Sequence, residues 1–96
     1  MNASGSGNVF LGYEAGADET GSNKLYIDNS NTTTPLVYGD FSDNQLTING
    51  SVNITEVMNL TPLATEPSNP KAGDIYFDST LGRHRGYDGT QWNNLY

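Results

Sequence analysis

The feature that most constrains this chain is an alternation of apolar residues that continues across an Asn-Gly pair. Asn-Gly between alternating apolar residues is usually a strong signal for a β-hairpin with a type I′ turn. In the stretch LTINGSVNI the pair is Asn49-Gly50. A two-residue loop there would place Leu46 and Ile48 on one face and Val52 on the other, because directly opposed residues share a face. Neither face would be apolar throughout, so the pattern predicts that the chain continues without folding back.

Treated as one extended segment, the same stretch keeps its aliphatic residues on one side. The members of this row are Leu46, Ile48, Val52, Ile54, Met58 and Leu60. Glu56 interrupts the row, and a bulge or kink there would keep its carboxylate away from apolar side chains. A short helix over residues 54–60 is an alternative, because apolar residues also follow Ile54 at spacings of three and four. The sequence leaves strand and short helix open for this segment.

An apolar edge of this length must be covered, and the composition limits what can cover it. The chain has 96 residues, no cysteine, 34% hydrophobic residues and a formal net charge of −7. Globular domains are usually richer in apolar residues, and small domains bury proportionally little of their surface. Without disulfides or an evident metal site, self-association is the remaining source of stability for such a chain. We therefore expect the chain to associate with copies of itself.

The charge and the residue types argue against several classes of function. The only basic residues are Lys24, Lys71, Arg83 and Arg85. The acidic chain thus lacks the cationic cluster that nucleic-acid phosphates require, and no stretch is long or apolar enough for membrane insertion. A single histidine, His84, without cysteine or a Gly-x-Ser-x-Gly motif gives no basis for nucleophilic catalysis. We expect no enzymatic activity and no cofactor.

Two polar stretches, DNSN at 28–31 and DFSDN at 40–44, place oxygen ligands at spacings somewhat like those of calcium loops. Neither stretch has the downstream bidentate glutamate of such loops. Asn and Asp in β-turns account for both stretches without an ion. We therefore expect no metal site.

Turn-forming residues divide the chain into short β-like elements and suggest four regions. Residues 1–8 are small and polar and are expected to form a flexible lead-in. Residues 9–61 contain short alternating segments separated by Gly, Asn, Asp and Ser and are expected to form one β-rich segment. Residues 62–73 contain three prolines, which cannot donate ladder hydrogen bonds, and are expected to form a linker. Residues 74–96 are expected to form a separate hairpin module.

The last region carries the clearest local prediction, a hairpin that closes near residue 80. The expected opposed pairs are Asp78 with Arg83, Phe77 with His84, Tyr76 with Arg85, and Ile75 with Gly86. One face would carry an Asp–Arg pair and a Tyr–Arg contact, which are favourable cross-strand neighbours. The other face would bury Ile75 and Phe77. A second turn, at residues 88–89, would return Trp92 and Leu95 to that apolar face.

Three stretches resemble segments of trimeric bacterial surface fibres and phage tail-fibre-like proteins. GNVFLGYEAG resembles the head repeats of trimeric adhesins, of the form Asn-x-Val-x-Ile/Leu-Gly-x-x-Ala, whose two aliphatic residues point into a β-roll. ETGSNKLYIDNSNTTTPLVYGDFSDNQLTING resembles the segment that follows such repeats. PSNPKAGDIYFDSTLGRHRGYDGTQWNNLY is similar to a small Gly-x-Ile-Tyr … Tyr-Asp-Gly-x-x-Trp module of the same fibres. The resemblance implies a homotrimer on a bacterial cell surface or a virion.

These observations predict an all-β fold, an intertwined homotrimeric β-prism or β-roll fibre segment with a small C-terminal β-hairpin module. The residues expected to line the trimer axis are Val9, Leu11, Leu25, Ile27, Leu36, Leu46, Ile48, Val52, Ile54, Met58 and Leu60. The expected function is structural and extracellular. Such a module would extend a surface or tail fibre and present an adhesive or receptor-binding tip.

Two alternatives remain open. The C-terminal module could itself bind carbohydrate, such as a cell-surface glycan, since exposed Tyr and Trp stack on sugar rings and Arg binds carboxylates or sulfates. The candidate ligand-binding residues are Arg83, Arg85, Tyr87 and Trp92. Trp92 could instead form the small core of the module together with Phe77. The second alternative, a monomeric β-sandwich, predicts a mass of 10.4 kDa in solution, one third of that of the trimer.

Overall fold

The structure, a computed structural model, describes residues 5–96 and is all-β, with no helix among those residues. The chain forms two compact units, Met1–Asn53 and Ile54–Tyr96, which are described separately. Each unit contains one four-stranded sheet. The strands are β1 (Val9–Leu11), β2 (Lys24–Ile27), β3 (Val37–Asp40), β4 (Gln45–Ile48), β5 (Pro62–Leu63), β6 (Ile75–Asp78), β7 (Arg83–Tyr87) and β8 (Trp92–Asn94). The predicted all-β class is confirmed.

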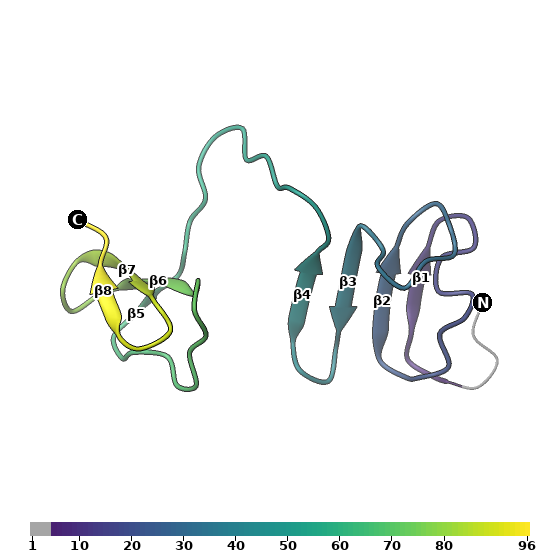
Figure 1. Cartoon of the computed structure of the whole chain (residues 1–96), viewed down its shortest axis with the longest axis horizontal. Coiled ribbons are helices and arrows are strands. Elements are labelled where there is room, and N and C mark those ends of the chain that lie inside the picture. The colour runs from purple at the N-terminus through teal and green to yellow at the C-terminus, as the bar shows by residue number, and fades with distance from the viewer. Residues whose placement is uncertain (1–4) are drawn as a thin grey trace. The chain divides into compact units, whose positions relative to one another are not determined.

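The strands of the first sheet lie in the order β1-β2-β3-β4 (Figure 1). β1 runs parallel to β2, whereas β2–β3 and β3–β4 are antiparallel. A parallel pair cannot be joined by a tight turn, and the connection from β1 to β2 is accordingly long. Gly12 and Gly16 lie in this connection with φ of 119° and 69°, a backbone region that favours glycine. The short β3–β4 turn uses Asn44, with φ of 53°.

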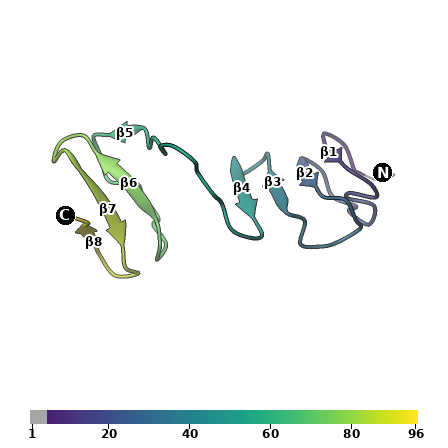
Figure 2. The same cartoon turned by 90° about the horizontal axis from the view of Figure 1, so that it is seen from above.

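The second sheet repeats the plan of the first. Its order is β5-β6-β7-β8, with β5 parallel to β6 and both later pairs antiparallel (Figure 2). The second strand reads LYI followed by Asp28 in one sheet and IYFD in the other. In each sheet the aliphatic residue that precedes the tyrosine opposes a glycine, as in the pairs Leu25–Gly39 and Ile75–Gly86. The same local pattern therefore organises both units.

Tyr26 is the centre of the first unit. It is 7% exposed, and its ring makes edge contacts with Phe10 at 5.5 Å and Tyr38 at 5.4 Å between ring centroids. Its hydroxyl donates to Glu19 Oε1 at 2.7 Å. Burial, with the bond to Glu19, raises the pKa of Tyr26 to about 12. The core of this unit is thus aromatic and hydrogen-bonded, and Ala15 in the β1–β2 connection is also buried.

In the second unit, Tyr76 and Asp78 are each 5% exposed, and the Tyr76 ring meets Trp92 at 4.8 Å between ring centroids. The predicted register of the β6–β7 hairpin is confirmed at every pair. The predicted choice of buried face is wrong, because Ile75 is 51% exposed. Trp92 lies against Tyr76 and not beside Phe77. The polar face is buried because its hydroxyl and carboxylate bond to each other and to neighbouring groups.

As the alternation predicted, the Asn49-Gly50 pair does not form a hairpin. β4 pairs with β3 alone, and no strand of the described chain follows until β5. The Asn49 backbone N–H donates to the Leu36 carbonyl at 3.0 Å, and its side-chain Nδ2 donates to the Pro35 carbonyl at 2.7 Å. Residues 49–61 form neither the extended strand that the alternation favours nor the alternative short helix.

The aliphatic residues expected at the trimer axis find little cover within their own chain. Exposed members of this set are Val9, Leu11, Leu36, Leu46, Val52, Ile54 and Met58, and half-buried members are Leu25, Ile27, Ile48 and Leu60. Each unit has its own small core, and most aliphatic side chains contribute to neither.

The observed division of the chain differs from the four expected regions. The boundary between the two units along the chain lies between Asn53 and Ile54, and not at residues 61–62. Pro62 and Leu63, expected in the linker, form β5 and pair with Phe77 and Asp78; a proline is tolerated there because β5 is an edge strand. Within the expected lead-in, residues 1–4 lie outside the described part. Asn8, by contrast, is bound to the start of β2, since its Oδ1 accepts from the Lys24 N–H at 2.8 Å.

Candidate functional site

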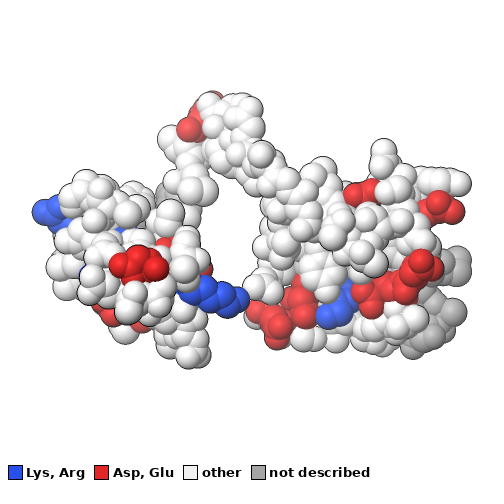
Figure 3. Space-filling view, in the orientation of Figure 1, with Lys and Arg blue, Asp and Glu red and all other residues white. Residues whose placement is uncertain are grey.

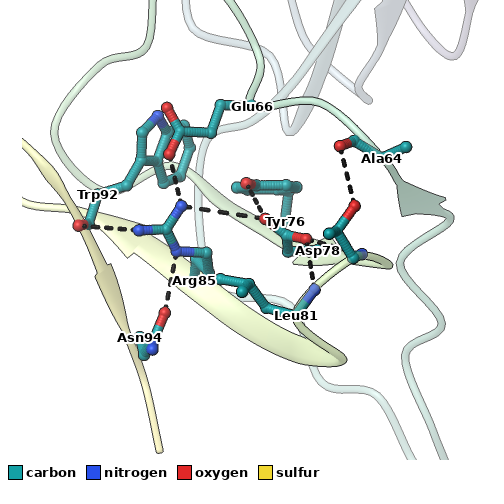
Figure 4. A network of polar contacts seen from close by, with 9 residues as sticks. Ala64, Glu66, Tyr76, Asp78, Leu81, Arg85, Trp92 and Asn94 are labelled. Atoms are coloured by element: carbon teal, nitrogen blue, oxygen red, sulfur yellow. Dashed lines mark hydrogen bonds and ion pairs between the residues drawn. The ribbon is translucent and has the colours of Figure 1, made fainter.

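Arg85, on the central strand β7, is the hub of a polar network in the second unit (Figure 4). Its Nε donates to Asn94 Oδ1 at 3.0 Å, and its Nη2 donates to the Trp92 carbonyl at 3.3 Å. Its Nη1 pairs with Glu66 Oε2 at 2.5 Å. The Arg85 side chain is only 15% exposed. Most of the five N–H groups of the guanidinium are therefore engaged within the protein.

Asp78 is the buried acidic end of this network. Its Oδ2 accepts from the Tyr76 hydroxyl at 2.9 Å and lies 4.0 Å from Arg85 Nη1. Its Oδ1 accepts from the backbone N–H groups of Leu81 and Thr80, each at 2.9 Å. The Leu81 N–H contributes most to lowering the pKa of Asp78 below its ordinary value, because it stabilises the carboxylate over the acid. The ionised Asp78 thereby holds the β6–β7 turn.

The four predicted ligand-binding residues do not form one group. Arg83 opposes Asp78 in the register, but its Nη1 donates to the Tyr96 carbonyl. Arg85 is occupied by the network described above. Tyr87 and Trp92 do lie together, with ring centroids 5.2 Å apart and planes inclined at 61°. Arg85 therefore lies beside the aromatic pair but is occupied by other partners, whereas Arg83 is directed to Tyr96.

The aromatic pair lines a cleft of about 440 Å³ in the second unit. The cleft residues are Glu66, Pro67, Pro70, Tyr87, Thr90, Gln91 and Trp92. Two chain segments form its walls, the proline-containing loop between β5 and β6 and the turn between β7 and β8. Its volume falls within the usual range of small-molecule sites, about 300–1,000 Å³.

Asp88 fixes the turn that forms one wall of this cleft. Its Oδ1 accepts from the backbone N–H groups of Gln91, at 2.9 Å, and Thr90, at 2.8 Å. Its Oδ2 accepts from Asn93 Nδ2 at 2.9 Å. The two backbone donors, Gln91 first, lower the pKa of Asp88 to about 2. An ionised Asp88 therefore holds the backbone that carries the exposed Thr90 and Gln91 side chains.

Sequence reasoning missed Glu66, Thr90 and Gln91 as cleft residues. Glu66 lies 19 positions before its partner Arg85 and within a segment that was expected to be a linker. No local pattern indicates that this segment returns to β7. A signal for Thr90 and Gln91 was present, because the second turn was predicted at Asp88 and both residues follow it directly.

An apolar groove of about 330 Å³ lies elsewhere in the same unit. Its lining residues are Val57, Met58, Asn59, Leu60, Pro62, Phe77 and His84. Phe77 and His84 are cross-strand partners whose ring centroids lie 4.9 Å apart. His84 Nδ1 also shares a hydrogen bond with the Tyr96 hydroxyl at 3.0 Å. Val57 and Met58 are 82% and 64% exposed, so the groove has apolar walls that the chain leaves in contact with solvent.

The surface has few basic side chains. Figure 3 shows Asp and Glu spread over the visible face, with Lys and Arg at few places. Lys24 is paired with Asp40 at 3.1 Å. Within residues 5–96, no three metal-binding side chains converge. In the first of the two calcium-like stretches, Asp28 Oδ2 accepts from the Leu36 N–H at 2.8 Å. The same part of the chain contains no helix suited to crossing a membrane.

Comparisons with known proteins give no family assignment for this chain. The sequence matches no protein-family model, and the searches of curated proteins and of solved structures find no significant match.

Proposed function

We propose that this chain is a structural, non-catalytic module of a homotrimeric extracellular fibre, on a bacterial surface or in a phage tail. The observation that carries the proposal is the row of exposed aliphatic side chains after β4. Val52, Ile54 and Met58 are 60%, 49% and 64% exposed and lie in a segment without strand or helix. A single polypeptide gains nothing from keeping these groups in water, whereas burial of each stabilises an assembly by roughly 1.5–3 kcal/mol.

The small cores of the two units support the same proposal. Among the described residues, the buried hydrophobic side chains are Ala15, Tyr26 and Tyr76, with Pro35 fully enclosed. Domains with so few buried groups and no disulfide ordinarily need a metal or partner chains. In the trimer that we propose, three copies of the aliphatic row meet around one axis, as a β-prism or β-roll. The likeness of GNVFLGYEAG and the C-terminal segment to fibre modules favours three copies over two.

The direct test is the mass of the chain in solution. Multi-angle light scattering over a concentration series should give about three times 10.4 kDa. Because subunit association follows mass action, dilution should dissociate the trimer before or together with unfolding. A constant mass of one chain at all concentrations would overturn the proposal, and a dimer would overturn the threefold arrangement.

A further inference from the structure

We propose that the cleft lined by Glu66, Tyr87, Gln91 and Trp92 binds an uncharged saccharide. The cleft lies wholly within the second unit and does not use the aliphatic row that the proposed trimer buries. The inference therefore stands independently of the proposed oligomeric state.

The first argument is the combination of rings and polar groups. Tyr87 and Trp92 are half-buried, and both line the cleft. An aromatic face accommodates the C–H face of a pyranose, while the hydroxyl groups at the sugar's edge require donors and acceptors. Thr90 and Gln91 are exposed at the same cleft and supply a hydroxyl and an amide. A purely apolar ligand would displace water from these groups without replacing its hydrogen bonds.

The second argument is that the polar groups are held in place before a ligand arrives. Glu66 Oε2 is fixed by Arg85, which leaves Oε1 to accept from a sugar hydroxyl. Gln91 is held twice, since its backbone N–H donates to Asp88 Oδ1 and its Nε2 donates to Asn93 Oδ1 at 3.4 Å. Preorganised contacts lose less conformational entropy on binding, which matters for a weakly hydrophobic ligand.

The charge of the cleft lining indicates which class of sugar the cleft binds. Glu66 is the only charged residue among those that line the cleft. Arg85 donates to Glu66, Trp92 and Asn94, Arg83 contacts Tyr96 instead, and Lys71, which follows Pro70, is not among the lining residues. A sialylated or sulfated glycan would bring a second negative charge to a lining whose one charged side chain is a carboxylate. The cleft therefore favours neutral sugars over the acidic sugars that the arginines first suggested.

The test uses the full chain and an array of oligosaccharides, one half neutral and the other half sialylated or sulfated. We expect binding on the neutral half only. The best neutral ligand is then titrated against Gln91→Ala, with Gln45→Ala as the matched control in the other unit. Loss of a hydrogen bond should weaken binding roughly fivefold in Gln91→Ala and leave Gln45→Ala unchanged. Glu66→Gln and Glu56→Gln form a second pair with the same expectation.

Four results would overturn the inference. The first is an array on which no neutral glycan binds, and the second is binding of acidic glycans that Arg83→Ala abolishes. The third is a neutral ligand that Gln91→Ala and Glu66→Gln bind as tightly as the unmodified chain does. The fourth is binding of a proline-rich peptide in place of sugars. Circular dichroism of each variant excludes unfolding as the cause of a loss. Light scattering on the same samples separates the two proposals, because a monomer that binds sugar contradicts only the trimer, and a trimer that binds none contradicts only the cleft.

Discussion

Tyr26 and Tyr76 occupy equivalent positions in the two sheets. Each lies on the second strand of its sheet, one residue after an aliphatic residue that opposes a glycine. Each is buried, and its hydroxyl donates to a carboxylate, Glu19 at 2.7 Å for Tyr26 and Asp78 at 2.9 Å for Tyr76. A buried tyrosine needs such a partner for its hydroxyl. The aliphatic–Tyr–apolar–Asp pattern thus places a buried tyrosine at the centre of each unit, but its Asp is the tyrosine's partner only in the second.

Replacing Tyr76 with Phe tests how much this centre depends on the hydroxyl. Tyr76→Phe removes the hydrogen bond that the buried Asp78 accepts from the Tyr76 hydroxyl. This loss should lower the urea midpoint of the second unit. Trp92 is the only tryptophan, so its fluorescence reports on this unit alone. Tyr13→Phe is the control, because Tyr13 is 74% exposed and its change should leave the midpoint unaltered. Equal midpoints for Tyr76→Phe and the unmodified chain would contradict the role given to the hydroxyl.

The ring of Phe10 and the backbone conformation of Gly16 both restrict this position to glycine. A Cβ at Gly16 would lie 2.5 Å from Phe10 Cδ1, and the φ of Gly16 is 69°. Gly82 has nearly the same φ, 68°, with no heavy atom within 4 Å of such a Cβ. Gly82→Ala should therefore cost about 1–2 kcal/mol from backbone strain alone. Gly16→Ala should cost about 1–3 kcal/mol beyond that value because the ring must move.

Hydrogen exchange can measure the free-energy cost of Gly16→Ala and of Gly82→Ala, because it reports local opening free energies within each unit. The amides of Tyr26 and Tyr38 report on Gly16→Ala, and those of Tyr76 and Arg85 report on Gly82→Ala. If the two alanines cost the same, contact with Phe10 contributes nothing to the packing of the β1–β2 connection.

The register of the second sheet was predictable from the sequence, and its buried face was not. The register depends on turn residues and on the alternation, which are local, so each pair from Ile75–Gly86 to Asp78–Arg83 was correct. The face was assigned by hydrophobicity, which placed Phe77 inside and Asp78 outside. Asp78 is buried because Tyr76 and two backbone N–H groups satisfy its oxygens. Such compensation depends on the exact position of partners, and composition does not reveal it.

The candidate site shows the same limit. Tyr87 and Trp92 were identified by residue type, because exposed Tyr and Trp stack on sugar rings; their pairing across β7 and β8 was not predicted. Glu66 could not be identified, because its place beside Arg85 depends on how the proline-containing segment returns to the sheet. Long-range pairing of this kind leaves no periodic pattern in the sequence.

Arg85 and Arg83 provide a matched pair for testing the polar network. Arg85→Lys should lower the urea midpoint of the second unit, since an ammonium group cannot bond Asn94, Trp92 and Glu66 in the planar geometry of a guanidinium. Arg83→Lys should have a much smaller effect, because Arg83 is exposed and contacts the chain terminus at Tyr96. Trp92 fluorescence again gives the readout. A reversed order of the two effects would show that Arg85 is not the hub.

Asp88 should make the β7–β8 turn sensitive to acid. Its pKa is lowered from 3.8 to about 2 in the folded chain, so the turn gains stability from the ionised form above about pH 4. As the pH falls from about 4 to 2, protonation weakens the bonds to the Thr90 and Gln91 N–H groups. The amide NMR shifts of Thr90 and Gln91 should titrate with a midpoint near 2, and Asp88→Asn should abolish this titration. A midpoint near 4 would contradict the assigned contacts.

Asp substitutions at the neighbouring residues Met58 and Asn59 test whether the aliphatic row lies in the interior of an assembly. Both are exposed in a single chain, so Asp at either position should leave an isolated subunit stable. In the proposed trimer, Met58→Asp brings three carboxylates into an apolar interior, where unpaired charges are strongly unfavourable. Asn59→Asp adds the same charge at a position outside the aliphatic row. Light scattering should therefore show monomers for Met58→Asp and trimers for Asn59→Asp.

The pH dependence of the Met58→Asp variant separates burial from simple repulsion. A carboxyl group in an apolar interior has a raised pKa, because burial disfavours its charged form. The variant should consequently regain trimer mass as the pH is lowered through the range in which the new carboxyl becomes neutral. The Asn59→Asp chain should keep one mass over the same range. Trimers of Met58→Asp at neutral pH would remove Met58 from the interior and, with it, the aliphatic row as the axis of the assembly.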